Sequence, residues 1–266
     1  MPIHLHMYGV SVLDLEQEFY EHFQIVPALT PYLQEQCYRL RFEVLCREKQ
    51  IPGFSAADYP DSLEKDEYDD RSVHYLIYHN ESGRYVGTVR LILWDNTNNL
   101  MAFPLIGHVH DYIDMAAIRN LPARQIAEIS RLVIIKEFRS RIRYLPFKEG
   151  TYEDYKKITR INHLVTHPVI GLLAAILKIS SENGIKYWVA GMEPSLNKRL
   201  SQLGLQLSPL GPLVEYHGMR RPYIGVVDDV VKSLYFNNKE IWKFVTEHGE
   251  LWPPPVTVKK RPNLSG

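Results

Sequence analysis

Two apolar runs that read as β-strands each contain an arginine. Arg90 lies within Tyr85–Trp94, and Arg131 lies within Ile126–Ile135. Both runs are rich in β-branched and aromatic residues, which favours strands. A guanidinium is costly to bury unless an anionic partner reaches it. A sheet built from these runs must therefore bring carboxylates to both arginines or leave the arginines at its edge.

Residues 64–69, the acidic loop, hold a cluster of carboxylates that can supply those partners. Glu64, Asp66 and Asp69 lie close together in the sequence, and Glu128 precedes Arg131 by three residues. In an extended segment, the period of two would place Glu64 and Asp66 on the same side. Each piece alone also fits a solvated acidic loop, with arginines that reach solvent along their apolar stems. The ordered set as a whole favours a site.

Length and charge limit the class of protein. The chain has 266 residues, with 31 basic and 31 acidic side chains and 45% hydrophobic residues. This is enough for one large core, so we interpret residues 1–250 as one domain and 251–266 as a Pro-rich, disordered tail. Zero net charge argues against bulk nucleic-acid binding.

The first residues lack the pattern of a secretory signal, and the longest apolar run, residues 169–177, is too short to span a bilayer. Cys37 and Cys46 point to opposite sides of a predicted helix, so we expect reduced thiols and a cytoplasmic location.

The order of predicted elements indicates an α/β (α+β) fold in which a mixed sheet is flanked by helices. Thr30 and Pro31 read as the N-cap and first residue of a helix, and Asn80-Glu81-Ser82-Gly83 reads as a hairpin turn. Residues 51–70 read as a loop. The other helices are expected over residues 11–23, 166–179, 194–203 and 228–248. The strands are expected over residues 73–78, 85–94, 100–105, 126–135, 186–192 and, with a break, 213–227.

Several motifs in this order resemble a known group of enzymes. The motifs are Tyr38-Arg39-Leu40-Arg41-Phe42-Glu43-Val44, Glu64-x-Asp66-x-x-Asp69, Gly87-Thr88-Val89-Arg90-Leu91, Phe103, Glu128-Ile129-Ser130-Arg131 and the stretch Tyr216–Tyr223. Over about residues 32–230 the chain resembles acyl-homoserine lactone synthases and long-chain N-acyl amino acid synthases of the GNAT acyltransferase superfamily. It resembles most the acyltransferases associated with PEP-CTERM/exosortase systems. The resemblance implies a mostly antiparallel GNAT-like sheet with a splayed or bulged central strand.

The chain also departs from the lactone-synthase pattern. Leu45 stands four residues after Arg41, where those enzymes usually have phenylalanine, and Gln50-Ile51-Pro52 occupies the region of their tryptophan. Phe138-Arg139-Ser140-Arg141 replaces the usual glycine-rich pyrophosphate loop. The first two departures argue against an S-adenosylmethionine acceptor site. The missing glycine loop argues against coenzyme A and leaves room for an acyl carrier protein as donor. The basic segment 136–160 suits such an acidic partner, although it also fits a solvated loop.

The implied chemistry is aminolysis of a thioester. An amine is mostly protonated at neutral pH, so a base must remove a proton, and the candidates are Glu64, Asp66 and Glu128. Crowded carboxylates raise one another's pKa, which suits a base. A β-bulge between Glu128 and Arg131 would bring these side chains to one face and free a backbone N–H near Val133 or Ile134 for the thioester carbonyl.

The remaining candidate residues bind substrate or the donor's carrier. Arg41, Arg90 and Arg131 either hold an acceptor carboxylate or lock the acidic loop, and both roles stay open. The substrate-binding or loop-ordering set is completed by Asp69, Phe103 and Ser130. The donor-carrier set is Val133, Ile134, Lys136, Arg139, Arg141 and Arg143. Tyr216, Arg220 and Arg221 either edge an acyl tunnel, grip the acceptor or form an edge-strand turn. No metal site is expected, since His108 and His110 lack a third ligand at a telling distance.

We therefore predict an N-acyltransferase that moves a long-chain fatty acyl group to the amine of an amino acid or related metabolite. No tightly bound cofactor is expected, and the co-substrate is acyl-ACP, through its phosphopantetheine arm, or acyl-CoA. The alternatives are an acyl-homoserine lactone synthase that uses S-adenosylmethionine and a non-catalytic module that binds acyl thioesters.

Overall fold

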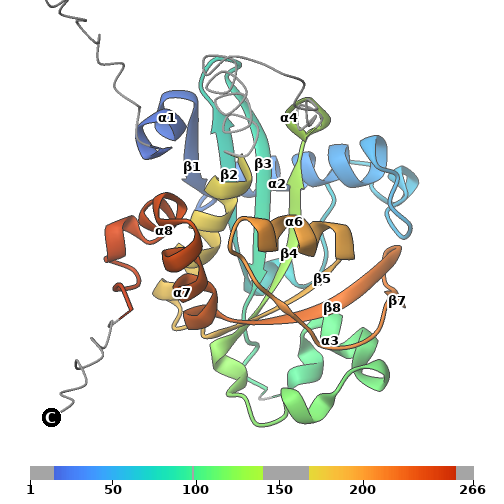
Figure 1. Cartoon of the computed structure of the whole chain (residues 1–266). Helices are drawn as coiled ribbons and strands as arrows, with labels where there is room; N and C mark the ends of the chain where they lie inside the picture. The colour runs from blue at the N-terminus through green and yellow to red at the C-terminus, as the bar shows by residue number, and fades with distance from the viewer. Residues whose placement is uncertain (1–14, 98, 140–167, 256–266) are drawn as a thin grey trace, which may run out of the picture.

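A mixed β-sheet forms the centre of the molecule (Figure 1). The computed structural model describes residues 15–97, 99–139 and 168–255. Within these residues the sheet has eight strands in the order β1-β2-β3-β4-β5-β8-β6, with β7 paired to β8. Only β4 and β5 of this described part run parallel, so the predicted mixed, mostly antiparallel sheet is confirmed. The strands are β1 (Phe23–Pro27), β2 (Ser72–His79), β3 (Arg84–Ile92), β4 (Ile126–Ile134), β5 (Tyr187–Met192), β6 (Ser208–Pro209), β7 (Val214–Glu215) and β8 (Met219–Val226).

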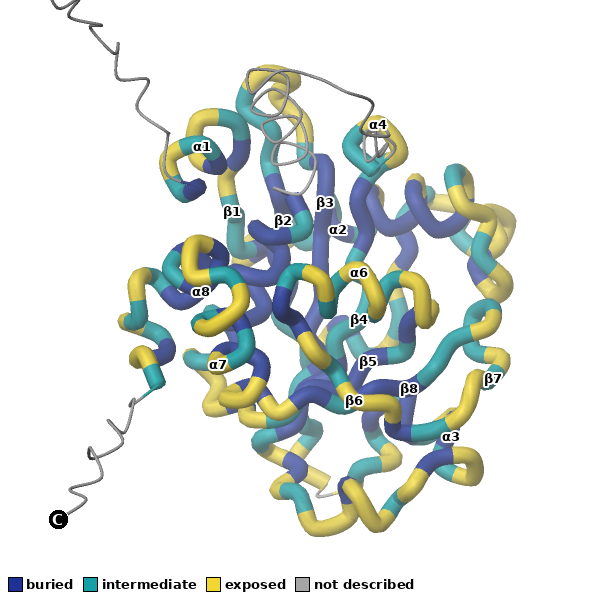
Figure 2. The backbone as a smooth tube through the Cα atoms, viewed as in Figure 1, coloured by how far each residue is buried: buried dark blue, intermediate teal, exposed yellow. Residues whose placement is uncertain are grey.

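Helices cover both faces of this sheet, whose middle strands are mostly buried (Figure 2). The helix over residues 168–182 packs on one face together with α1, α7 and α8, and α2 and α3 lie on the other. The predicted start of α2 is confirmed, since Thr30 Oγ1 accepts from Leu33 N at 3.3 Å and Pro31 is the first helical residue. A π-helix, Glu43–Glu48, continues α2. The helices are α1 (Leu15–His22), α2 (Pro31–Phe42), α3 (Pro104–Val109), α4 (Lys136–Arg139), α6 (Pro194–Gln202), α7 (Val227–Asn237) and α8 (Lys239–Val245).

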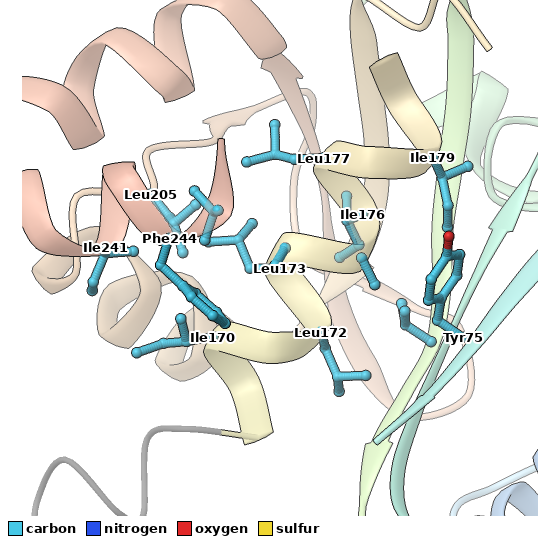
Figure 3. Packing of buried hydrophobic residues seen from close by; sticks show 14 of the residues in the cluster. Tyr75, Ile170, Leu172, Leu173, Ile176, Leu177, Ile179, Leu205, Ile241 and Phe244 are labelled. Carbon is cyan, nitrogen blue, oxygen red and sulfur yellow. The ribbon is translucent and has the colours of Figure 1, made fainter. Parts of the chain in front are cut away.

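The helix over residues 168–182 forms the centre of the larger hydrophobic core. In Figure 3 its side chains lie between Ile241 and Phe244 of α8 on one side and Tyr75 of β2 on the other. Gly171 allows α1 to approach this helix, because a Cβ there would lie 2.6 Å from the ring of Phe19. Each fully buried aliphatic side chain in this core, such as Leu177, contributes roughly 2 kcal/mol of transfer free energy.

A β-bulge on β4 decides which side chains reach the opposite face. Thr88 pairs with Val133 and Arg90 with Ser130, so one extra residue of β4 lies between these pairs. Arg131 has a φ of 52°, in the left-handed region. Because side chains alternate between faces, the extra residue inverts the alternation beyond it. Glu128 and Arg131 therefore lie on the same face of the sheet, and the bulged central strand is confirmed.

Two predicted elements are wrong. Residues 100–105 form a 3-10 turn, Leu100–Ala102, followed by α3, rather than a strand. Pro104 occupies the first position of α3, where its missing N–H costs nothing and its fixed φ suits a helix. The expected helix over 228–248 is two helices, because Asn238 leaves the helical conformation between α7 and α8 and its side chain caps Ile241 N.

The predicted tail begins as part of the packed domain. The Trp252 side chain is buried, and its indole N–H donates to Asp228 Oδ1 at 2.7 Å. Residues 251–255 were expected to be disordered, and burial of this aromatic ring holds them against α7 instead. No helix in the described ranges is long and apolar enough to cross a bilayer.

Candidate active site

Arg41 anchors a buried ion-pair network beneath the acidic loop. Its side chain is fully buried on α2. Its guanidinium donates to both oxygens of Asp69, at 2.7 and 3.1 Å, and through Nε to Glu64 Oε2. Burial alone would lower the pKa of Arg41, but the charges of Glu64 and Asp69 outweigh it and raise the pKa above its ordinary value. This arginine therefore fixes two carboxylates of the loop at once.

Arg90 and Arg131 complete the network from the sheet. Arg90 donates to Asp66 and Asp69, with 2.7 Å between its Nη1 and Asp69 Oδ1, and through Nε to Ser130 Oγ at 2.9 Å. Arg131, at the bulge, donates to Glu64 at 2.9–3.1 Å and to Asp66 Oδ2 at 2.9 Å. The convergence expected from the sequence is thus present, with every arginine bridging two carboxylates.

The acidic loop owes its conformation to these contacts and to its own backbone. Asp69 Oδ2 accepts from Asp66 N at 2.8 Å, and Asp66 Oδ1 accepts from Tyr68 N at 3.0 Å. Burial raises the pKa of Asp69 and of Glu64, but the neighbouring arginines outweigh burial and hold both pKa values below the ordinary range. The crowding of carboxylates was expected to raise their pKa. For Glu64 and Asp69 the shift has the opposite sign, because each gains a buried guanidinium.

Glu128 lies beside this network in a different environment. Its side chain is buried, and it makes one hydrogen bond within the described residues, from Leu105 N to Oε2 at 2.9 Å. Burial raises the pKa of Glu128 to about 7, against smaller opposing effects of the Leu105 N–H, Arg90 and Arg131. Near neutral pH this carboxyl is therefore divided between its acid and base forms.

Aromatic side chains from three segments form a connected row, here called the rim, that begins at the Arg131 guanidinium. The Phe54 ring lies under the Arg131 guanidinium at 4.7 Å and contacts the His217 ring at 4.6 Å. Tyr216 follows, 4.8 Å from His217 and 4.9 Å from His108. Burial, and then the charge of Glu128, raises the pKa of Tyr216, so its hydroxyl stays protonated. The rim thus places Tyr216 within electrostatic reach of Glu128.

The sheet opens beside Glu128. Pairing between β4 and β5 extends from Ile126 to Glu128 on β4 and stops there, while β4 continues to Ile134. Val133 and Ile134, predicted to line the donor's thioester, lie on this continuation and pair with β3. Both are buried. The opening separates β4, which carries Arg131, from β5, which pairs with β8.

The predicted donor-carrier residues lie at the end of β4. Glu48 accepts from the backbone N of Lys136 at 2.9 and 3.0 Å and from Arg139 Nη2 at 2.8 Å. Arg139 also donates to Ile134 O at 3.0 Å. Arg141 and Arg143 lie outside the described residues. An internal carboxylate therefore already balances part of the charge that was expected to meet a donor.

Three residues of the site carried too little sequence signal to be singled out. Phe54 lies in a loop without periodicity, and Glu48 becomes a partner of α4 only through the fold. His74 is buried with its Nε2 3.6 Å from Asp69 Oδ1, and burial lowers its pKa to about 4.

Phe103, predicted for the substrate set, is fully buried, with the Arg71 guanidinium 5.8 Å from its ring. The described residues contain no group of three or more side chains suited to a metal ion.

Comparison with known proteins defines the class of this fold. Residues 40–145 match a family model described as an acetyltransferase (GNAT) domain. Among solved structures, BjaI, a CoA-dependent acyl-homoserine lactone synthase determined with SAM and isopentyl-CoA, is 22% identical over 83% of this chain and 89% of its own, with a TM-score of 0.52. TofI, in a ternary complex with an inhibitor and MTA, is 15% identical over 81% and 95%, with a TM-score of 0.51. MesI, another CoA-dependent acyl-homoserine lactone synthase, is 19% identical over 85% and 95%, with a TM-score of 0.50.

The fold is therefore GNAT-like: residues 40–145 match the model of an acetyltransferase (GNAT) domain, and the whole fold resembles that of acyl-homoserine lactone synthases. A search of curated proteins finds no significant match.

Proposed function

We propose that this protein is an N-acyltransferase that moves a fatty acyl group from a carrier thioester to the amine of an amino acid or related metabolite. The observation that carries the proposal is Glu128, a buried carboxyl with a pKa raised to about 7 beside the opening between β4 and β5. A base with this pKa is suited to deprotonating an amine near neutral pH. The matches to a GNAT domain and to enzymes that use CoA thioesters support acyl transfer.

The proposed reaction begins with Glu128 as its carboxylate. It takes a proton from the acceptor's ammonium group, and the neutral amine attacks the thioester carbonyl. The C–N bond forms and the C–S bond breaks. The nitrogen of the adduct releases its extra proton to solvent, and the departing thiolate takes the proton held by Glu128, so the carboxylate is restored. A backbone N–H of β4 at Val133 or Ile134 polarises the carbonyl oxygen as negative charge develops on it.

Within this proposal Glu64, Asp66 and Asp69 hold the site together instead of transferring the proton. Glu64 and Asp69 have lowered pKa values and accept from two arginines each. A carboxylate of low pKa is a weak base, and moving it would leave a buried guanidinium unpaired. Of the two roles left open for Arg41, Arg90 and Arg131, this assigns them the locking of the acidic loop.

We propose that the donor reaches Glu128 through the opening between β4 and β5, with its carrier near Lys136 and Arg139. Lys136 and Arg139 would meet the phosphate of a phosphopantetheine arm. Arg141 and Arg143, predicted for the same set, lie outside the described residues. Both an acyl carrier protein and coenzyme A present this chemistry. An association with exosortase systems and a cytoplasmic location remain expectations from the sequence.

Mass spectrometry of reaction products tests the function. The purified chain is given palmitoyl-ACP or palmitoyl-CoA with amino acids, simple amines or S-adenosylmethionine. The proposal expects an amide product and release of free thiol. Homoserine lactone products from S-adenosylmethionine alone would instead identify a lactone synthase. Thioester binding without thiol release across the panel would identify a binding module.

Glu128→Gln tests the assigned base. It keeps an oxygen that accepts from Leu105 N but removes the base, so kcat should fall about 10²- to 10⁴-fold. In the parent, kcat/KM should rise with pH and level off above about 7, since Glu128 must be deprotonated. Glu250→Gln, an exposed carboxylate, is the matched control. Near-parental activity of Glu128→Gln with an unchanged pH profile would exclude Glu128 as the base.

A further inference from the structure

The opening between β4 and β5 widens toward one edge of the sheet, here called its mouth. β4 and β5 run parallel, so both strands end there, β4 at Ile134 before α4 and β5 at Met192. β8 runs antiparallel to β5, and Arg221 pairs with Met192, so β8 begins at the same edge. Arg139 of α4 and Arg220 of β8 therefore belong to the elements on the two sides of the mouth.

The segment that carries Lys49 contacts the elements on both sides of the mouth. Lys49 directly follows the π-helix that ends at Glu48, and Glu48 accepts from Arg139 Nη2 of α4 at 2.8 Å. A few residues later, Pro52 O and His217 Nδ1 are 3.3 Å apart, so the same segment also contacts the turn that leads into β8. The chain around Lys49 therefore spans the mouth from α4 to the start of β8.

Cations at the mouth lack a carboxylate partner within the described residues, and they are Lys49, Arg220 and Arg221. Arg139, in contrast, is paired with Glu48 at 2.8 Å. Arg220 donates through Nε to a backbone carbonyl at 3.2 Å, and its terminal nitrogens have no partner in this part of the chain. The alternation of side chains along β8 turns Arg221 to the opposite face of the sheet from Arg220. Lys49 and Arg220 thus offer N–H donors that no ion pair engages.

The positive charges at the mouth lie close enough to act on one another. Burial and then the charge of Arg139 lower the pKa of Lys49, and Arg220 adds to this effect, while Glu193 and Glu48 oppose it. Like charges held together disfavour one another's charged forms. An anion between Lys49 and Arg220 would relieve this repulsion and would gain hydrogen bonds from both side chains.

The position of the mouth matches the length of a phosphopantetheine arm. From Glu128 to its end at Ile134, β4 extends about 20 Å at roughly 3.3 Å per residue. The arm has about thirteen bonds between its phosphorus and the thioester sulfur, and an extended chain of that many bonds spans roughly 16 Å. With the thioester beside Glu128, the phosphate would therefore lie near the end of β4, where the side chains of the mouth reach it.

Resting on the proposed acyltransferase function, we infer that Lys49 and Arg220 bind the phosphate of the donor's phosphopantetheine arm at the mouth of the opening. Arg139 reaches a phosphate only by sharing or leaving Glu48, whereas Lys49 and Arg220 bind it without breaking an ion pair within the described residues. The two side chains come from opposite sides of the mouth, so the phosphate holds the arm across the opening. Acyl carrier protein and coenzyme A both carry this phosphate.

Two ligands that differ only in the phosphate test this inference without turnover. Titration calorimetry measures the Kd of 4′-phosphopantetheine and of pantetheine for the parent protein. The phosphorylated ligand should bind about 10- to 100-fold more tightly, since its phosphate gains charge-assisted hydrogen bonds. Equal Kd values, or no detectable binding of either ligand, would overturn the inference. Phosphate-dependent binding without thiol release from any acyl donor would refute the proposed function and leave the phosphate site in place.

Single substitutions assign the phosphate to these two side chains. Lys49→Gln and Arg220→Gln should each weaken binding of 4′-phosphopantetheine about tenfold and leave that of pantetheine unchanged, whereas Lys49→Arg should keep the parental preference. Lys232→Gln, on α7 beyond the other end of β8, is the matched control and should bind both ligands as the parent does.

Folded Lys49→Gln and Arg220→Gln variants with parental Kd values for both ligands would overturn the inference. A rise in KM confined to an amino acid acceptor, and absent with the corresponding amino amide, would assign these cations to the acceptor's carboxylate and overturn it as well.

Discussion

Burial of Glu128 should make the protein less stable at neutral pH than in mild acid. The pKa of this carboxyl rises from an ordinary value of 4.5 to about 7 in the folded protein. The folded state therefore holds a proton that the unfolded chain has already released between these two values. The free energy of unfolding must fall as the pH rises from about 4.5 to about 7, and it stays lower above that. The shift corresponds to a loss of roughly 3 kcal/mol.

Replacing Glu128 with glutamine removes this titration. Between about pH 5 and about pH 8 the stability of Glu128→Gln relative to the parent should rise by roughly 2 to 3 kcal/mol. In a domain of this size that is a relative gain in Tm of roughly 5 to 10 °C. Thermal unfolding followed by circular dichroism at the two pH values measures it, with Glu250→Gln as the control. The assignment of a raised pKa is refuted if the Tm difference between variant and parent does not change with pH.

Two further perturbations probe the network and the donor end of the site. Arg41→Lys removes a buried guanidinium that pairs with Glu64 and Asp69, so the free energy of unfolding measured in urea should fall by about 3 to 5 kcal/mol. Arg39→Lys alters an exposed pair with Glu35 and should lower it by less than about 1 kcal/mol. Similar losses in both variants would contradict the buried network. Glu48→Gln removes the carboxylate that accepts from the Lys136 backbone N and from Arg139. Arg139 is then available to a donor phosphate, so the KM for a phosphate-bearing donor should fall several-fold, with little change in the KM for the amine. A higher donor KM would place the carrier elsewhere.

Local patterns in the sequence were sufficient for most elements of the fold. The hairpin of β2 and β3, the cap at Thr30 and the proline at position 31 follow from residue types whose effects act within a few positions. The arginines within apolar runs required buried anions, and the acidic loop supplies them. Where the local pattern was ambiguous, the prediction was wrong. The apolar residues 100–105 fit a strand as well as a turn and helix, and the packing of Leu105 and Ile106 against β4 and β5 decided between them.

The chemistry of Glu128 was decided by the tertiary structure. Its neighbours in sequence give no reason to treat it differently from Glu64, and both carboxyls are buried in the fold. Glu64 meets two guanidinium groups, and its pKa is lowered, whereas Glu128 gains one backbone N–H, and its pKa is raised. Residue types along the chain determined which charges were available and that they had to be paired. Which of them were paired depended on the three-dimensional positions of α2, β3, β4 and the Arg131 bulge, because ion pairing and desolvation act over a few ångströms of space regardless of separation along the chain.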